Sequence, residues 1–408
     1  MLHSSRRPER SACYHFSGRR RNATESPDAM IEIVFWMACI TLVYVYVLFP
    51  IAVRLLARRF GIAASDADLP LSVSIIVTAY NEEKGILAKL ENLLALDYPS
   101  QLVDIIVASD ASSDATDRMV RDCGSQRVQL LRVEGRKGKT ACQNAAAAIA
   151  RGEILVFTDA TTRLDARALR ALIRRFYAAD VGCVAGRLMY VSRTENVTGR
   201  GGEAYWDYEI KLRTAESALG SLVGVSGCLY AVRRSAYREI NPGLISDFVI
   251  SMKMREQSLR TVLAVDAVCY EETLNRGTQE LSMRVRVAIR SINALVCERR
   301  FLNLWRYGIF AWQLWSHKLL RYASPFLWLI ALGANLALAS KHPLYAALLA
   351  CQLAVILVGA VGFALQSRLA KLGMLSKPYY FLLTNVASFL AALRYARGER
   401  MVTWKPLR

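Results

Sequence analysis

Short apolar runs alternate with helical stretches in the central part of the chain. The runs read SVSIIVTA, VDIIVAS, RVQLLRV and EILVFT, and a stretch with helical character follows each of them, such as GKTACQNAAAAIA after the third. Strands that are apolar on both faces are typical of a parallel sheet covered by helices on both sides. We therefore predict an α/β domain over residues 70–300, with a Rossmann-like, doubly wound and mostly parallel sheet. After VGCVAG the alternation is less regular.

Longer apolar runs flank this domain. Hydrophobic residues make up 54% of the chain, and much of the excess lies in the segments 31–53, 323–340 and 343–365. Each of these is nearly uncharged and approaches the ~20 residues that span a bilayer. We expect three transmembrane helices, because the alternative of a buried core helix rarely lacks charge over such a length.

Two further segments have a mixed or short apolar pattern. Residues 301–322 combine tryptophan with arginine, lysine and histidine, which is typical of an amphipathic helix at a membrane interface; a helix packed on the domain is the alternative. Residues 379–393 are apolar but number only about 15, which predicts a re-entrant, interfacial or fourth membrane helix.

The charge distribution indicates how the domain is oriented. The formal charge of +19 would suit a nucleic-acid-binding protein, but the chain has no zinc-finger spacing and no basic stripe interleaved with aromatic residues, so we expect no nucleic acid. Arg54, Arg58 and Arg59 instead follow the first apolar run, and Arg368 and Lys371 follow the third. The positive-inside rule then places the domain in the cytosol, beside anionic lipid of the cell's inner (plasma) membrane. The nine cysteines include no C-x-x-C pair, which indicates neither a zinc site nor a disulfide framework.

The two ends of the chain are basic. Residues 1–29 are rich in arginine and serine without apolar periodicity, so we expect a disordered tail. Such a tail would compete with the arginines after the first span for the cytosolic side, which suggests as a hypothesis that translation starts at Met30. Residues 394–408 form a second basic tail.

Polar residues follow the predicted strands at the edge where ligands of parallel sheets bind. Asp110 comes after VDIIVAS, where its carboxylate could accept a hydrogen bond from a base or ribose, and Asp159 comes after EILVFT, where it could hold a metal on a diphosphate. Either alone could equally cap a helix or a turn. Lys137 and Lys139 lie in a glycine-containing turn that opens a helix, an arrangement suited to phosphate. The chain has neither a Walker loop nor a G-x-G-x-x-G after the first strand, which argues against a nicotinamide or flavin enzyme.

Six motifs together resemble one family. VSIIVTAYNEE, ASDASSDAT, GRKGKTACQNAA, FTDATTRLDARAL, GCLYAVRR and ISDF, in this order over residues 72–290, resemble the family-two inverting glycosyltransferases with the GT-A fold. The membrane segments are also similar to those of the processive branch that makes cellulose, chitin and hyaluronan. The resemblance implies a nucleotide-sugar donor and these roles: Asp110 at the nucleobase, Glu82 lining the nucleotide pocket, Lys139 near the nucleotide, Asp159 as first carboxylate of a D-x-D metal motif, and Asp247 as general base.

The last two site residues come from the second half of the domain. Inversion requires a carboxylate opposite the leaving diphosphate to take the proton of the acceptor, and Asp247 of ISDF matches that position. The alternative is a helix N-cap, and both roles can coexist. Arg286 in MRVRV matches the arginine of Q-x-x-R-W, which implies a clamp on the diphosphate. A solvated or lipid-facing arginine is the alternative there, since Arg284 and Arg290 are neighbours.

The chain also departs from the family pattern. The departures are Thr161 for the second D-x-D carboxylate, Ser246 for the glutamate before the base, Met283 for glutamine and Val287 for tryptophan. A metal held through Asp159 alone would depend on diphosphate oxygens and water, which Mg²⁺ tolerates, with Mn²⁺ as the other candidate. Tyr205 and Trp206 could replace the lost aromatic platform for a sugar.

The resulting expectation is a membrane-bound, metal-dependent, inverting hexosyltransferase that uses a nucleotide-sugar, for which we expect a UDP-linked donor. Its acceptor would be a polysaccharide or a lipid-linked glycan, with transfer to a polyprenyl phosphate or glycolipid as one alternative. A catalytically silent membrane scaffold of the same fold is the other. A growing polymer needs a channel, so few membrane helices would imply an export or channel partner subunit.

Overall fold

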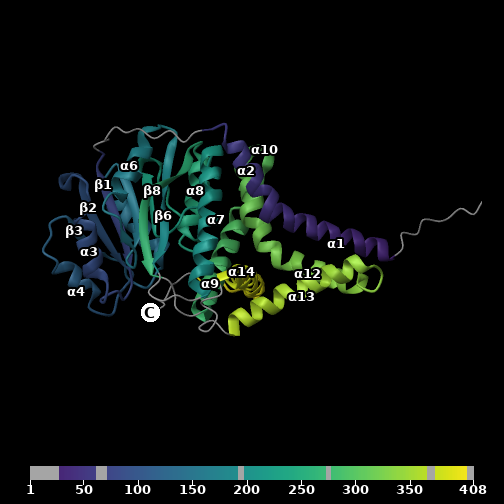
Figure 1. Ribbon diagram of the computed structural model, residues 1–408. Coiled ribbons are helices and arrows are strands. Elements are labelled where there is room, and N and C mark those ends of the chain that lie inside the picture. The colour runs from purple at the N-terminus through teal and green to yellow at the C-terminus, as the bar shows by residue number, and fades with distance from the viewer. Residues whose placement is uncertain (1–26, 61–70, 192–196, 273–276, 365–372, 402–408) are drawn as a thin grey trace, which may run out of the picture.

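An eight-stranded mixed sheet forms the core of the domain on the left of Figure 1. The computed structural model describes residues 27–60, 71–191, 197–272, 277–364 and 373–401. The strand order is β3-β2-β1-β4-β7-β6-β8-β5. The strands are β1 Val73–Ala79, β2 Val103–Ser109, β3 Val128–Arg132, β4 Ile154–Asp159, β5 Arg163–Leu164, β6 Val181–Val191, β7 Leu229–Arg233 and β8 Arg260–Glu272.

The four strands expected from the apolar runs, β1 to β4, pair with one another in parallel. β2 pairs with both β1 and β3, and β4 pairs with β1, all in parallel. β7 then pairs antiparallel with both β4 and β6, and β8 runs parallel to β6. The predicted α/β class is confirmed, with a sheet that is parallel in its first half and mixed in its second.

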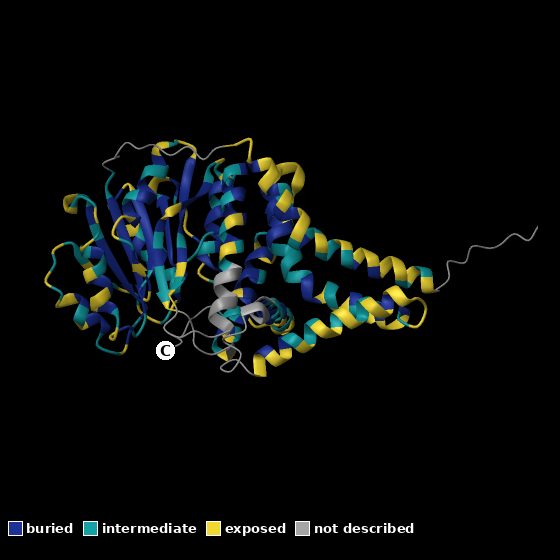
Figure 2. Ribbon diagram, in the orientation of Figure 1, coloured by how far each residue is buried: buried dark blue, intermediate teal, exposed yellow. Residues whose placement is uncertain are grey.

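Helices cover both faces of the sheet, which explains why the central strands are apolar throughout. One buried cluster joins α3, α4 and α6 to the sheet, and a second joins α5, α8, the end of α9, α10 and α11 to the other face. In Figure 2 the strands are accordingly dark blue along most of their length. These helices are α3 Ile86–Leu94, α4 Thr116–Arg121, α5 Lys139–Ile149, α6 Ala168–Ile173, α7 Val197–Leu219, α8 Ser246–Glu256, α9 Gly277–Cys297, α10 Leu304–Tyr307 and α11 Ile309–Leu314.

Three helices of the described chain are long and apolar enough to cross a membrane: Asp28–Ala57, Ile309–Leu338 and Pro343–Ala364. The first comprises α1 Pro27–Val43, a π-helical turn and α2 Phe49–Ala57; the second comprises α11, a π-helical turn Trp315–Leu319 and α12 Leu320–Leu338; the third is α13 Pro343–Ala364. Much of their outer surface is exposed and appears yellow in Figure 2. These helices associate the chain with a membrane.

The segment expected to be one interfacial helix, 301–322, is divided in the structure. Tyr307, Phe310 and Leu314 pack into the core of the sheet domain. The helix that begins at Ile309 then continues without a break to Leu338. The aromatic residues of this segment therefore join the domain to the membrane helix.

The last helix, α14 Gly373–Ala396, crosses the other membrane-side helices and is seen nearly end-on in Figure 1. It packs against α7, α9, α12 and α13. Tyr380 reaches Glu280 and Arg284 of α9 through hydrogen bonds. The predicted segment 379–393 thus belongs to a longer helix that braces α9. The predicted basic tails lie mostly outside the described residues, at 1–26 and 402–408.

Candidate active site

The carboxyl ends of β1, β2 and β4 bring the predicted nucleotide residues to one edge of the sheet. Asp110 follows β2 directly, and its side chain is fully buried. The backbone N–H of Gly138 donates to both of its oxygens at 3.2 Å, and Arg136 lies 3.9 Å away. Arg136 stacks 3.1 Å over the ring of Tyr80. Asp110 therefore holds the loop before α5 at the end of β2, and Arg136 joins the same loop to Tyr80 after β1.

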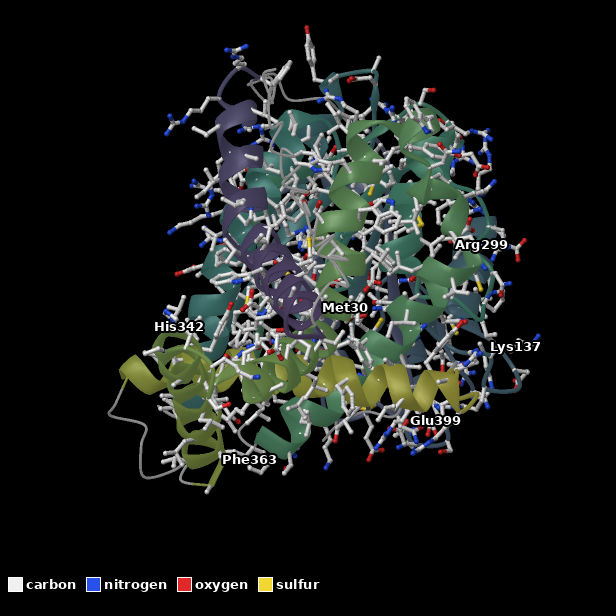
Figure 3. All side chains as sticks on the ribbon, turned by 90° about the vertical axis from the view of Figure 1, so that its right-hand side faces the viewer. Met30, Lys137, Arg299, His342, Phe363 and Glu399 are labelled. Atoms are coloured by element: carbon white, nitrogen blue, oxygen red, sulfur yellow. The ribbon has the colours of Figure 1, made fainter. Side chains whose placement is uncertain are left out.

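Two other predicted residues lie around that loop. Glu82 is buried, and its backbone N–H donates a hydrogen bond to the hydroxyl of Thr116 at 2.8 Å. Lys137 is exposed, and Figure 3 shows it at the rim of the molecule. The helix that Lys137 precedes begins at Lys139.

Lys139 lies among carboxylates. Its ammonium forms an ion pair with Asp159, the last residue of β4, and lies 3.4 Å from the carbonyl oxygen of Gly227. Burial opposes the charge, but Asp159 and Asp247 outweigh it and raise the pKa of Lys139. The lysine thus stays protonated and suited to binding phosphate oxygens.

Asp247 reaches this cluster from the other half of the domain. It lies in the first turn of α8, whose N-cap is Ile245, so Asp247 is not the capping residue. A Cβ on Gly227 would lie 2.7 Å from Oδ2 of Asp247 and 2.9 Å from Nζ of Lys139. Burial raises the pKa of Asp247, as does Asp159, whereas Lys139 and Arg290 oppose the increase. A raised pKa suits a carboxylate that takes a proton during the reaction.

Glu271 supplies a second carboxylate near Asp159. It lies at the end of β8, where Oε1 is 3.5 Å from the hydroxyl of Thr161 and Oε2 is 3.5 Å from Sγ of Cys228. Burial, followed by the charge of Asp159, raises the pKa of Glu271 to about 7. The side chain that replaces the second D-x-D carboxylate therefore contacts a glutamate from a distant strand.

These oxygens fit a hard divalent cation. Carboxylate oxygens are the ligands that Mg²⁺ and Mn²⁺ prefer, and such ions are commonly held by one or two carboxylates together with phosphates. Within the described residues there is no group of three or more His, Cys, Asp or Glu that could hold a metal without a substrate. Asp159 and Glu271 fit a cation that is completed by a diphosphate.

A buried lysine supports the turn that carries Asp159. Nζ of Lys89, in α3, donates to the hydroxyl of Thr158 at 2.9 Å and to the carbonyl of Thr162 at 2.6 Å. Burial lowers the pKa of Lys89 to about 8, although Asp159 opposes the shift. Both ends of the turn around Asp159 are therefore tied to one side chain.

Helix α9 presents two arginines to the site. Arg286 is half-buried and has Asp159 as its electrostatic partner, while Arg290, one turn later, has Asp247. Burial lowers the pKa of both. Arg284 points elsewhere and pairs with Glu280 at 2.7 Å. Arg286 thus lies on the donor side, as predicted for a diphosphate clamp, and Val287 beside it is exposed.

The predicted aromatic platform is described only in part. The ring of Trp206 lies 5.6 Å from that of Tyr190, which pairs with Glu271 across β6 and β8. The side chain of Tyr205 lies outside the described residues.

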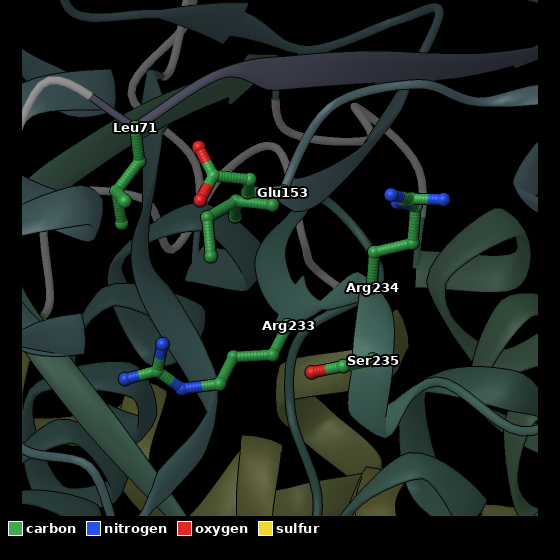
Figure 4. A pocket seen from close by; sticks show the side chains of 6 residues that line it. Leu71, Glu153, Arg233, Arg234 and Ser235 are labelled. Carbon is green, nitrogen blue, oxygen red and sulfur yellow. The ribbon is translucent and has the colours of Figure 1, made fainter.

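A cavity of about 220 Å³ lies away from all of these residues (Figure 4). Its lining includes Leu71, before β1, Ile154, at the start of β4, and Arg233, at the end of the antiparallel β7. It is therefore at the amino ends of the parallel strands, opposite the edge where ligands of such sheets bind.

The comparison with known proteins decides the family. The profile described as "Glycosyl transferase family 2" matches residues 74–240. The chain carries a family 2 glycosyltransferase domain. The match ends before Asp247, so the base candidate, Glu271 and the arginines of α9 lie beyond the part of the family 2 domain that the profile covers.

Curated relatives match this domain over limited lengths. The beta-monoglucosyldiacylglycerol synthase of Trichormus variabilis is 29% identical over 175 residues, which cover 42% of this chain and 37% of that protein. The UDP-Glc:alpha-D-GlcNAc-diphosphoundecaprenol beta-1,3-glucosyltransferase WfaP of Escherichia coli is 32% identical over 87 residues, or 21% and 34% of the two chains. The chain thus spans well under half the length of these relatives. Neither name refers to an export or channel subunit, so the partner expected from the sequence has no support here.

A solved structure shares the fold over most of the chain. The mannosyltransferase PcManGT from Pyrobaculum calidifontis, in complex with GDP-Man and Mn²⁺, superposes with a TM-score of 0.64 at 24% identity. The match covers 87% of this chain and 99% of that chain. This confirms the GT-A fold of the family 2 domain.

Three contributors to the site were missed in the sequence. Glu271 ends a strand in VCYEE, and its acidic pair after an apolar run was a usable signal. Gly227 and Lys89 gave none, because a close approach of Gly227 to Asp247 and the burial of Lys89 depend on contacts between distant segments.

Proposed function

We propose that this chain transfers a hexosyl group from a nucleotide-sugar to a hydroxyl of a lipid-linked or glycolipid acceptor, with inversion at the sugar. One observation carries the proposal: Lys139 and Asp247 meet at Gly227, with Asp159 on the other side of the lysine. The cation of Lys139, which would bind a diphosphate, and the carboxylate of Asp247, which would take the acceptor proton, thus both lie beside Gly227. The names of two relatives, a beta-monoglucosyldiacylglycerol synthase and a glucosyltransferase with a GlcNAc-diphosphoundecaprenol acceptor, favour a lipid over a free polysaccharide.

On the donor side, the nucleotide would lie along the ends of β1 and β2, with its base toward Asp110 and Glu82. Lys139 and Arg286 would bind the diphosphate and stabilise the charge that develops as the glycosyl bond breaks. Lys137 would contact the nucleotide from the rim of the site, and Trp206 and Tyr205 would border the sugar.

Asp159 and Glu271 would hold a divalent cation, Mg²⁺ or Mn²⁺. When bound, such a cation neutralises charge on a leaving diphosphate. Glu271 would take the part of the carboxylate that Thr161 replaces, with the Thr161 hydroxyl orienting it.

On the acceptor side, Asp247 would take the proton of the attacking hydroxyl. Its carboxylate receives that proton as the oxygen–carbon bond forms, and the electron pair of the broken glycosyl bond leaves with the diphosphate. The membrane helices and the basic residues that flank them suggest that the reaction takes place at the cytosolic face of the inner membrane.

The decisive experiment compares the wild type with Asp247→Asn. The full chain in detergent would be given a panel of nucleotide-sugars, Mg²⁺ or Mn²⁺ and native lipids, and nucleoside diphosphate release and donor binding would be measured. We expect the variant to bind donor normally and to lose about 10²–10⁴-fold in transfer. Asp122→Asn, at an exposed aspartate that follows α4, is the matched control. Normal turnover by Asp247→Asn would refute the assignment.

A further inference from the structure

Helix α9 carries two arginines of the site: Arg286 on the side of the sugar donor and Arg290 on the side of the sugar acceptor. Residues 286 and 290 are four apart, so they lie on one face of the helix. Arg286 interacts electrostatically with Asp159, and Arg290 interacts with Asp247. Asn293, further along α9, donates to the carbonyl of Gly243 just before α8 at 3.3 Å, which fixes this part of α9 against the segment that carries Asp247.

Arg290 is a buried cation for which the described part of the chain shows no hydrogen-bonded partner. It is 8% exposed, and its Nε makes no hydrogen bond. No carboxylate of the described chain lies within ion-pair distance of it. A buried charge is costly unless it is paired, because the protein interior solvates it poorly. Asp247 is the carboxylate whose charge acts on this guanidinium, but no ion pair joins the two among the described residues, so the guanidinium can bind a further anion.

Lys318, on the second membrane helix, also lies close to the segment that carries Asp247. It lies in the π-helical turn between α11 and α12, with Nζ 5.6 Å from the ring centroid of Phe248, the residue after Asp247. It forms no ion pair with a carboxylate of the described residues. Its neighbours differ: Arg321 pairs with Glu209 at 2.9 Å, and Arg213 donates to the carbonyl of Gly224 at 2.8 Å.

Arg290 and Lys318 lie between Asp247, the proposed base, and the apolar part of the membrane helix. Tyr322, one turn after Lys318, interacts with Ser291, the residue after Arg290. From Lys318 the helix continues to Leu338 through its apolar part. A lipid whose chains lie along that part would have its head group beside Arg290, Lys318 and Asp247.

We propose that Arg290 and Lys318 bind a phosphate or diphosphate in the head group of the membrane-lipid acceptor and so place an acceptor hydroxyl beside Asp247. This inference rests on the proposed function and narrows its acceptor to anionic lipids. A neutral acceptor such as a glycosyldiacylglycerol would leave both cations unmatched. Phosphate oxygens accept several charge-assisted hydrogen bonds, which a guanidinium and an ammonium can donate together.

The test measures binding of four probes to the full chain in a neutral detergent. Farnesyl phosphate and dioctanoyl phosphatidic acid carry a phosphate, and farnesol and dioctanoylglycerol are their neutral counterparts. We expect at least one phosphate to bind about tenfold or more tightly than its counterpart, as a charge-assisted contact predicts. The preferred phosphate then identifies an isoprenoid or a glycerolipid source.

Substitutions test whether Arg290 and Lys318 cause the preference for phosphate probes. Arg290→Gln and Lys318→Gln should each remove most of the preference for phosphate, and Arg290→Lys should retain part of it. Arg299→Gln, at an exposed arginine on the rim in Figure 3, should change nothing. Affinity for a nucleoside diphosphate is measured in parallel, because it reports both folding and the donor site. Equal binding of phosphate and neutral probes by the wild type, or a preference unchanged in both glutamine variants, would overturn the inference. Failure of the wild type to bind any nucleotide would count against the proposed function instead.

Discussion

The α-carbon of Gly227 lies directly against the carboxylate of Asp247. A methyl group there would come within 2.7 Å of Oδ2, closer than a real Cβ comes to any atom, and within 2.9 Å of the Lys139 ammonium. Neither group could keep its position. The glycine therefore sets the distance between the proton acceptor and the cation on the donor side.

Gly227→Ala should reduce transfer by roughly 10²-fold, because displacing a catalytic group by about 1 Å costs that much. Donor affinity should also fall, since Lys139 moves. Gly220→Ala is the control, because a Cβ at Gly220 meets nothing within 4 Å. Steady-state rates and nucleotide binding of the two variants would be compared; an active Gly227→Ala enzyme would show that Asp247 works from another position.

The pairing of Asp159 with Glu271 makes a prediction about cations. Asp159→Asn should abolish Mn²⁺ binding in the presence of a nucleoside diphosphate, and Glu271→Gln should weaken it by about 10-fold or more. Electron paramagnetic resonance of free Mn²⁺ measures this without turnover. Glu272→Gln, at the exposed neighbouring glutamate, should bind Mn²⁺ as the wild type does. If Glu271→Gln also does so, Asp159 acts without it.

Glu271 should also make stability depend on pH. Its pKa is raised from 4.5 to about 7 in the folded chain, so folding favours its protonated form. Its contribution is complete below about pH 4.5 and is lost as the pH rises through 7. In EDTA, the wild type should therefore lose more thermal stability than Glu271→Gln between pH 5.5 and pH 8.5, by a few degrees. Parallel curves for the two proteins would contradict the raised pKa.

His317 joins the membrane helix to α7 through two buried carboxylates. Its Nδ1 lies 2.7 Å from Glu216 and its Nε2 lies 2.9 Å from Glu209. Burial disfavours ionisation of Glu209, but His317 and Arg321 outweigh it and hold its pKa well below its usual range. Glu209 therefore remains ionised in the folded protein.

His317→Ala should destabilise the protein by about 3–5 kcal/mol, because it leaves buried charge without its partner. The exposed His342, whose Nδ1 accepts from the N–H of Leu344 at 3.1 Å, is the matched control. His342→Ala should cost about 1 kcal/mol, as for a lost helix cap. Thermal unfolding in detergent compares them, and equal losses would mean that the buried network contributes little.

The sequence predicted the fold better than the site, for a physical reason. Apolar runs report which strands are buried on both faces, so β1 to β4 and the α/β class were predictable. Asp110 and Asp159 could be placed because strand ends share an edge in any parallel sheet. The approach of Glu271 to Thr161 could not be, because it depends on β5 and β8 pairing antiparallel across about a hundred intervening residues. The division of segment 301–322 was likewise hidden, since one aromatic-rich pattern serves both the domain core and a membrane helix.

The charged contacts of His317 limit how the protein can be simplified. A fragment of residues 71–308, designed to be water-soluble by leaving out the membrane helices, would keep Glu209 and Glu216 on α7 but lose the histidine and arginine that face them. It would also expose the apolar surface that Phe310 and Leu314 cover in the core of the sheet domain. Such a fragment is expected to aggregate, whereas solubilising the whole chain in detergent or a lipid disc keeps the two parts together.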